Sequence, residues 1–295
     1  MIVKICAMDW SGAVLPTLSR WFVLSAFIAL FGALSFPPLV MRGGSVAALR
    51  AQIQPHARRW VSAWIAIAAT ASLLDALAQR TGWSFITLGA RVILLGALWM
   101  CVRRSLTLPT LFFGGLLLLS QSFQGNAARE AAWALAVLAD WVHLLFSAIW
   151  LGGVAFLAAV VLPQARRDAA SLRPLGRTVE AFSPLAVMSV LAIGLTGIMQ
   201  SASLIGSVEA LAGTLHGRAL LAKLGGSAVL IGFGAFHLLV ISPRLNAWRA
   251  QAETLAQAAQ RFSVSLIAEA ATALFVIAAA AAMTILPAAR DAFQP

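Results

Sequence analysis

Long apolar runs alternate with short polar segments along most of the chain. Each run is close to the roughly 20 residues that a helix needs to cross a bilayer. The runs occupy 20–41, 58–79, 84–102, 106–125, 132–162, 183–204, 217–242 and 262–286. Backbone polar groups in lipid must be satisfied within their own segment, so each run predicts a helix. The sequence therefore predicts an all-α, polytopic membrane bundle of about eight transmembrane helices.

The charged residues between the runs predict how this bundle is oriented. Thirteen of the 21 Lys and Arg residues follow the first, third, fifth and seventh runs, namely Arg42, Arg50, Arg58, Arg59, Arg103, Arg104, Arg166, Arg167, Arg173, Arg177, Arg244, Arg249 and Arg261. Short loops rich in Lys and Arg stay in the cytoplasm. We therefore expect both termini on the periplasmic side. The residues before the first run do not have the pattern of a cleavable signal peptide.

Composition supports a membrane protein and excludes two other classes. The chain of 295 residues is 61% hydrophobic and only 11% charged, which a soluble domain of this size could not bury, so lipid is an expected partner. The net charge of +11 does not indicate nucleic-acid binding, because the basic residues lie in short loops between apolar runs. The two cysteines, Cys6 and Cys101, lie far apart and form no disulfide framework.

The chain divides into two parts of a single membrane unit. We expect an N-terminal four-helix region, 1–130, and a four-helix core, 131–295, made of two related hairpins. The hairpins match at an offset of 80 residues, which pairs Gly152 with Gly232, Pro163 with Pro243, and Phe182-Ser183 with Phe262-Ser263. The intervening segments, 164–182 and 244–261, predict short helices at the membrane surface rather than domains.

Asp140 and His143 begin the fifth run and are the first candidates for a functional site. Three residues apart, they lie on one face of a helix. An acid at the bilayer centre costs about 2.5 to 3.5 kcal/mol, so such a pair is a functional-site hypothesis. In that hypothesis Asp140 orients the His143 ring. The alternative is a packing pair at the interface.

Further side chains that bind soft metals are expected at the same, outer side of the membrane. They are Met199, His216, Met283 and, in the N-terminal segment, Cys6 and Met8. Thioether, thiolate and imidazole groups favour copper(I), and imidazole also suits copper(II). The methionines could instead fill the core, and His216 could be a loop residue. The sequence leaves the oxidation state open.

Other charged residues inside the runs need partners. Asp75 and Arg91 are expected to pair across a hairpin, while Lys223 and Glu269 either pair or line a polar path. A structural salt bridge is as good an interpretation as a conduction role for these groups. His237, near the inner end of its run, is either an exit ligand or a packing histidine.

Four stretches of the chain resemble the CopD family of copper-resistance proteins of the inner membrane. They are DWVHLLFSAIWLGG, FSPLAVMSVLAIGLTGIMQ, TLHGRALLAKLGGSAVLIGFGAFHLLVISP and FSVSLIAEAATALFVIAAAAAMTILP, and the resemblance covers about 105–287. The positions that match the family's motifs are Asp140, His143, Trp150, Gly152, Gly153, Arg218, Lys223 and Glu269.

The resemblance implies a protein of the bacterial inner membrane that binds copper at the periplasmic face and moves it across. It also implies a periplasmic copper-binding partner of the CopC type, and it favours import without deciding direction. One departure concerns a Gly-His pair usual in the family, which reads Gly125-Asn126 here. An amide is a poor copper ligand, so we expect His216 or Met199 to substitute.

Two other interpretations compete with copper transport. The first is a membrane scaffold or assembly protein that does not transport. The second is a b-type haem redox protein, which needs histidines paired at matched depths on facing helices. The sequence has no phosphate-binding loop and no credible nucleophile–base arrangement, so neither an ATP-driven pump nor a hydrolytic enzyme is expected.

Overall fold

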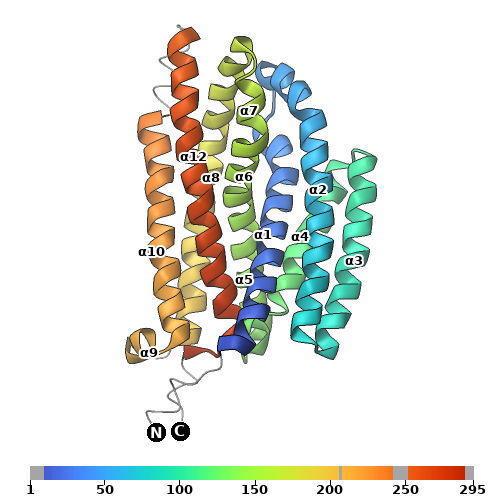
Figure 1. Ribbon diagram of the computed structural model, residues 1–295, viewed down its shortest axis with the longest axis vertical. Coiled ribbons are helices and arrows are strands. Elements are labelled where there is room, and N and C mark those ends of the chain that lie inside the picture. Colours follow the sequence, from blue (N-terminus) through green and yellow to red (C-terminus); the bar gives the residue numbers. More distant parts are fainter. Residues whose placement is uncertain (1–9, 206–207, 242–251, 290–295) are drawn as a thin grey trace.

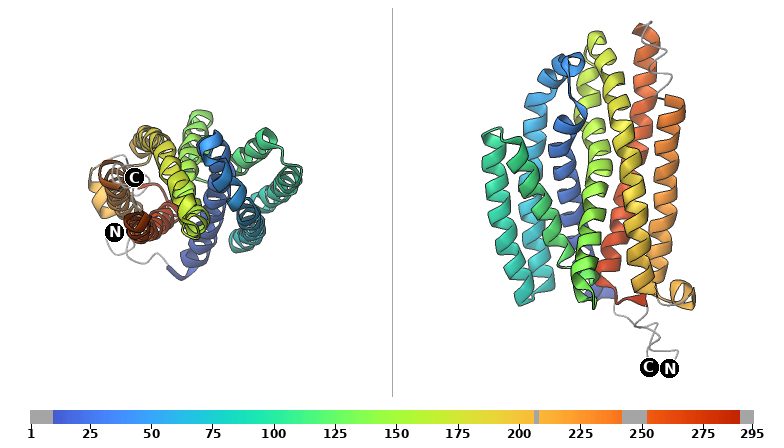
Figure 2. Two further views of the ribbon diagram at one scale, coloured as in Figure 1. Left: turned by 90° about the horizontal axis from the view of Figure 1, so that it is seen from above. Right: turned by 180° about the vertical axis from the view of Figure 1, so that it is seen from behind.

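The computed structural model describes residues 10–205, 208–241 and 252–289 as an elongated bundle of helices (Figures 1 and 2). The α-helices are α1 (Trp10–Val40), α2 (Ala47–Gln79), α3 (Gly82–Arg103), α4 (Thr107–Ser122), α5 (Trp133–Ser147), α6 (Gly153–Phe156), α7 (Leu162–Ala165), α8 (Ala169–Ile205), α9 (Val208–Gly213), α10 (Leu215–Phe236) and α12 (Ala252–Ile285). Short 3-10 turns are η2 (Gly44–Val46) and η3 (Asn126–Arg129), and π turns are η4 (Ala148–Gly152), η5 (Leu157–Val161) and η6 (His237–Ile241). Within the described ranges there is no strand.

Length and hydropathy confirm the prediction of an all-α polytopic bundle. Seven helical segments of the described chain are long and apolar enough to cross a membrane. The remaining predicted span, 106–125, corresponds to α4, which is apolar but has only 16 residues. At 1.5 Å per residue α4 is about 24 Å long, somewhat shorter than a typical hydrocarbon core of about 30 Å.

The segment 164–182 differs from its prediction as a separate surface helix. α8 begins at Ala169 and continues without interruption to Ile205. Leu172, Leu175 and Val179, in its first three turns, are buried against the bundle, which explains why the helix extends beyond the apolar run. In the other predicted surface segment, 244–261, the residues from Ala252 onward belong to α12, and the residues before it lie outside the described part.

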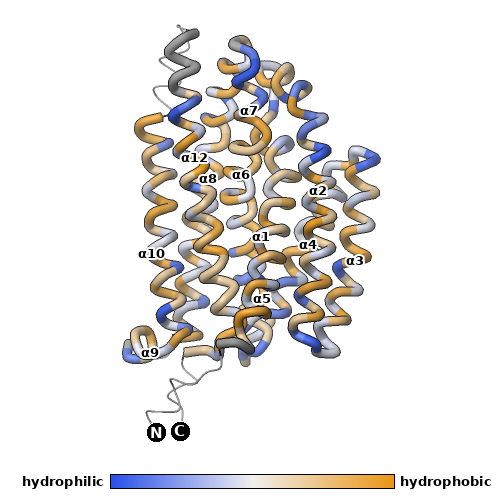
Figure 3. The backbone as a smooth tube through the Cα atoms, viewed as in Figure 1, coloured by the Kyte–Doolittle hydropathy of each residue, from blue (hydrophilic) through white to orange (hydrophobic). Residues whose placement is uncertain are grey.

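Most of the strongly hydrophilic residues lie toward the two ends of the bundle, and the middle is mostly hydrophobic (Figure 3). α1 begins and α12 ends at the lower end in this view, whereas the arginine-rich connection between α1 and α2 lies at the upper end (Figures 1 and 3). This arrangement agrees with an even number of crossings. Which end faces the periplasm stays a prediction from the charge pattern.

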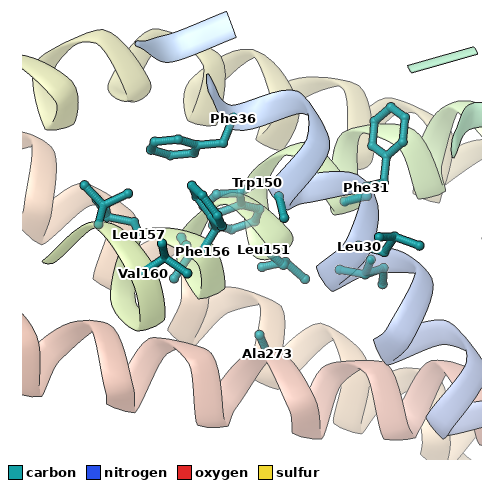
Figure 4. Packing of buried hydrophobic residues seen from close by; sticks show 14 of the residues in the cluster. Leu30, Phe31, Phe36, Trp150, Leu151, Phe156, Leu157, Val160 and Ala273 are labelled. Carbon is teal, nitrogen blue, oxygen red and sulfur yellow. The ribbon is translucent and has the colours of Figure 1, made fainter. Parts of the chain in front are cut away.

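α1 is the central helix, in contact with α2, α4, η4 and α12. The Trp21 indole N–H donates to the Leu274 carbonyl at 3.0 Å and so joins α1 directly to α12. Large apolar side chains fill the space between α1, the η4–α6–η5 segment and α12, as Figure 4 shows for Phe36, Trp150 and Phe156. The hydrophobic core therefore combines the two predicted parts of the chain.

α1 approaches η4 at a contact between two glycines. A Cβ atom added to Gly32 would collide with the backbone of Gly152, and one added to Gly152 would collide with the Ile28 carbonyl. The next glycine, Gly153, leaves similar room for the Phe182 ring. Small residues that let two helix backbones come close are a common means of association in membranes. This contact is a structural reason for the Gly-Gly pair that the sequence comparison with the family singled out.

Two π turns repeat at the spacing of the predicted duplication. η5 (Leu157–Val161) and η6 (His237–Ile241) are 80 residues apart, and each ends two residues before the proline of its hairpin, Pro163 or Pro243. η4, in contrast, has an α-helical counterpart in α10. The two hairpins therefore share one irregular turn and differ at the other. Because π turns occur frequently at functional sites, this difference directs attention to η4.

Candidate metal site

A cavity of about 300 Å³ lies between α1, η3, α5, α8, α10 and α12, in the half of the bundle where α1 begins. We call it the outer cavity. Seven of the predicted residues line it, namely Asn126, Asp140, His143, Met199, His216, Lys223 and Met283. Cys6 and Met8 lie outside the described residues. The sequence placed five of these side chains, those of Asp140, His143, Met199, His216 and Met283, at one end of the bundle, and the structure brings them to one cavity together with Asn126 and Lys223.

His143 projects from α5 and is held by α8. Its side chain is buried, and its Nδ1 lies 3.0 Å from the Thr196 hydroxyl oxygen. The same hydroxyl lies 2.7 Å from the Ala192 carbonyl and 3.2 Å from the Ile193 carbonyl, to either of which it can donate its single hydrogen. When it does so, it accepts from His143 Nδ1–H, and the lone pair of the neutral imidazole is then on Nε2, where it can bind a metal.

The role expected for Asp140 is wrong. Thr196 of α8, and not Asp140, orients the His143 ring. The Asp140 carboxylate interacts electrostatically with the Lys223 ammonium instead. α5 packs between α4 and α8, so residues one turn apart on it meet different neighbours. Asp140 therefore contributes negative charge to the outer cavity, and the packing pair with His143 is not formed.

His216 enters the outer cavity from the sharp corner between α9 and α10. The Thr214 side chain caps α10 by accepting a hydrogen bond from the Gly217 backbone N–H at 3.0 Å. Gly217 packs so closely on the α9 carbonyls that a Cβ atom would not fit. Arg218 is exposed and donates from Nε to the Ala212 carbonyl at 3.2 Å, so it braces the corner from outside. The corner turns His216 inward, where it is buried and not a loop histidine.

Asn126 connects η3 to the end of α12. Its amide nitrogen donates to the Met283 carbonyl at 3.1 Å. The side chain is therefore a structural link at the cavity wall, which agrees with its poor quality as a copper ligand. His216 and Met199, the expected substitutes, line the same cavity. That they replace the missing histidine stays a prediction.

Lys223 and Glu269 do not pair with each other. Lys223 lies in the outer cavity and interacts with Asp140, while Glu269 lies 3.2 Å from His237, measured from Oε2 to Nδ1. His237 also places Nε2 2.7 Å from the Ser265 hydroxyl. His237 and Glu269 line a second cavity of about 220 Å³, which we call the inner cavity. The expected pair of Lys223 and Glu269 is therefore wrong, and a polar path along these residues stays a prediction.

The predicted pair of Asp75 and Arg91 is confirmed, with a distance of 3.5 Å, and it includes a second arginine. Arg20 lies 3.6 Å from the same carboxylate. All three side chains are almost completely buried. Polar side chains complete the network, which includes Ser19, Gln79, Ser120, Gln121 and Gln124. Sequence reasoning overlooked Arg20, although an arginine at the edge of an apolar run was a signal for it.

The donors present in the outer cavity limit the ions that it fits. In the described part of the chain, no three His, Cys, Asp or Glu side chains are grouped so as to hold a metal ion. The soft donors that line the cavity are the imidazoles of His143 and His216 and the thioethers of Met199 and Met283. Hard cations prefer clusters of oxygen ligands, whereas an imidazole–thioether set suits copper.

Comparison with known proteins agrees with this chemistry. Residues 176–283 match the family model described as Copper resistance protein D. The chain is 33% identical over 181 residues to the Copper transport protein CutJ of Bacillus subtilis (strain 168), which covers 61% of this chain and 30% of that protein. It is 25% identical over 169 residues to the Copper resistance protein D of Pseudomonas syringae pv. tomato, or 56% of this chain and 54% of that protein.

These matches confirm the resemblance seen in the sequence motifs. The chain spans about a third of the length of the first relative and about half of the second. The family match includes Met199, His216, Lys223 and Met283 but begins after Asp140 and His143. No solved structure matches the chain.

Proposed function

We propose that this CopD-family protein binds copper ions in the outer cavity and moves them across the membrane. The observation that carries the proposal is the convergence of His143 and His216 with Met199 and Met283 on one cavity. These residues come from four different helices, α5, α8, α10 and α12. Four side chains that bind soft metals thus meet at a single place, and the two histidines among them are costly to keep within a membrane.

The geometry suggests a division of roles. His143 offers Nε2, with its ring held by Thr196, and the methionines offer sulfur. Asp140 supplies a negative charge that favours a cation. Lys223, beside it, carries a positive charge that opposes one. An ion between these two charges is bound less tightly than Asp140 alone would bind it, and moderate affinity suits a carrier that must release its cargo.

The cellular context follows from the charge pattern and the relatives. The arginine-rich loops favour a bacterial inner membrane orientation with the outer cavity on the periplasmic side. One relative is named as a copper transport protein and the other as a copper resistance protein, which supports copper as the cargo. We further propose delivery by a periplasmic CopC-type protein, and movement toward the cytoplasm.

The test is copper binding by purified protein and by a His143→Ala variant. Equilibrium dialysis against copper(I) kept reduced, and separately against copper(II), gives the metal bound per protein. We expect His143→Ala to lose copper from the outer cavity, and the matched variant His56→Ala, on α2 outside both cavities, to keep it.

Four outcomes would contradict the proposal or its direction. Wild-type protein that binds no copper would favour a scaffold, and a Soret band in its absorption spectrum would favour a haem protein. Unchanged binding in His143→Ala would place the site elsewhere. Copper accumulation in cells that express the protein alone decides direction, since a fall in cell copper would contradict import.

A further inference from the structure

The inner cavity contains a compact polar group in apolar surroundings. Glu269 is 1% exposed, and its carboxylate is 3.2 Å from the His237 ring, whose other nitrogen lies near Ser265. Most other residues that line the cavity are apolar, and the Phe262 ring packs edge-on against His237 with 5.1 Å between ring centres. A carboxylate this deeply buried is costly unless a cation or a hydrogen-bond donor accompanies it.

The distance between these two donors suits a metal ion. Two ligands that are each about 2.0 to 2.2 Å from an ion, at a tetrahedral angle, are roughly 3.4 Å apart. The observed 3.2 Å from His237 Nδ1 to Glu269 Oε2 is close to this separation. A small cation could therefore enter between the two groups with little movement of either helix.

Trp150 separates the inner cavity from the outer one. Its indole is buried, it lines both cavities, and it is the one residue common to their walls among the described residues. It belongs to η4, the π turn that has no counterpart in the second hairpin. Gly152 anchors that turn against Gly32 of α1, and Gly234 of α10 lies beside the indole ring.

We propose that His237 and Glu269, assisted by Ser265, form a second binding site for the copper ion on the far side of Trp150. The proposal rests on the function proposed above and adds the route that the copper ion takes through the protein. Copper leaves the imidazole and thioether groups of the outer cavity, passes the Trp150 ring, and is held by imidazole and carboxylate. Because the Trp150 ring lies between the two binding sites, the ion can move from one site to the other without an open channel through the bundle.

The experiment combines copper binding with copper flux in proteoliposomes. We expect the wild-type protein to bind two copper ions, and Glu269→Gln and His237→Ala each to bind one. Both variants should keep the affinity of the outer site, which also shows that they are folded. Their flux should fall by more than about tenfold, as expected when a group that holds a metal is removed. His56→Ala serves again as the matched histidine control.

The outcomes distinguish this proposal from the proposed function. If wild-type protein binds one copper ion that depends on His143, and Glu269→Gln leaves binding and flux unchanged, the inner site is wrong and the outer site stands. If no copper depends on His143, the proposed function fails first. Trp150→Phe places a smaller ring between the two cavities, so it should raise copper flux several-fold while two ions stay bound. Unchanged flux in that variant would overturn the role of the Trp150 ring.

Discussion

Gly152→Ala tests whether the glycine contact between α1 and η4 holds the bundle together. The added methyl group would meet the Ile28 carbonyl and lie 2.9 Å from the Gly32 Cα atom. Carbon atoms in contact prefer about 3.5 to 4.0 Å, so the contact with the Gly32 Cα atom alone requires the two backbones to separate by roughly 0.6 to 1.1 Å. The closer contact with the Ile28 carbonyl oxygen requires a larger separation. Backbone atoms cannot rotate away as a side chain would. The strain is therefore transmitted to the whole helix contact.

The expected cost follows from what packs around this contact. Overpacking a core typically costs about 1 to 3 kcal/mol. We expect the upper part of this range, because separating α1 from η4 also loosens the packing of Phe36, Trp150 and Phe156. Ala is otherwise the better helix former by about 0.8 to 1.0 kcal/mol, so the clash must exceed that gain to be seen.

Gly232→Ala provides a matched control. Gly232 is the counterpart of Gly152 at the repeat offset of 80, and a Cβ atom there would meet nothing within 4 Å. We expect unfolding of purified protein in a mild-to-denaturing detergent series to show a large loss of stability for Gly152→Ala and little change for Gly232→Ala. Equal stability of Gly152→Ala and wild type would refute the close approach of α1 and η4.

Three further substitutions test other parts of the structure. Asp75→Asn leaves two buried arginines without their carboxylate. The free energy of unfolding in the same detergent assay should therefore fall by about 3 to 5 kcal/mol. Thr196→Val removes the group that fixes the His143 ring, and copper affinity measured by competition should fall by about 10- to 100-fold. Asn126→His adds an imidazole to the outer cavity, and we expect tighter copper binding in the same competition measurement.

Each of these expectations has a control or a contradicting result. Asp168→Asn makes the same chemical change at an exposed helix start, where Asn caps as well as Asp, so it should be nearly neutral. Thr272→Val removes a hydroxyl that is exposed on α12 and should leave copper affinity unchanged. Loss of affinity in Asn126→His would show that the link to Met283 matters more than an added ligand.

The fold could largely be predicted because the length and hydropathy of membrane helices identify them in a sequence. The apolar runs located all the long helices, and the extension of α8 was missed for a definite reason. Leu172, Leu175 and Val179 are too widely spaced among polar residues to form an apolar run. Only their burial against other helices shows that they belong to the bundle. Helix ends that depend on tertiary contacts cannot be read from local pattern.

The sequence predicted where the residues of the candidate site lie along the bundle, but not which side chains they contact. Topology placed His143, His216, Met199 and Met283 at one end of the bundle, and they share a cavity. The sequence could not show which partners Asp140 and His143 take, since that depends on how the neighbouring helices are rotated about their axes. The same rotation brings Thr196 to the His143 ring.

The contact between α1 and α12 has a consequence for how the protein is made. The hydrogen bond from Trp21 to Leu274 joins residues 253 positions apart in the chain. At about 5 to 20 residues per second, α1 waits roughly 13 to 50 s in the membrane before its partner is synthesised. During that time the buried arginine of α1 can already find Asp75 of α2. This early ion pair would keep α1 beside the growing bundle, and translation of α12 would then complete the outer cavity as a late step of biogenesis.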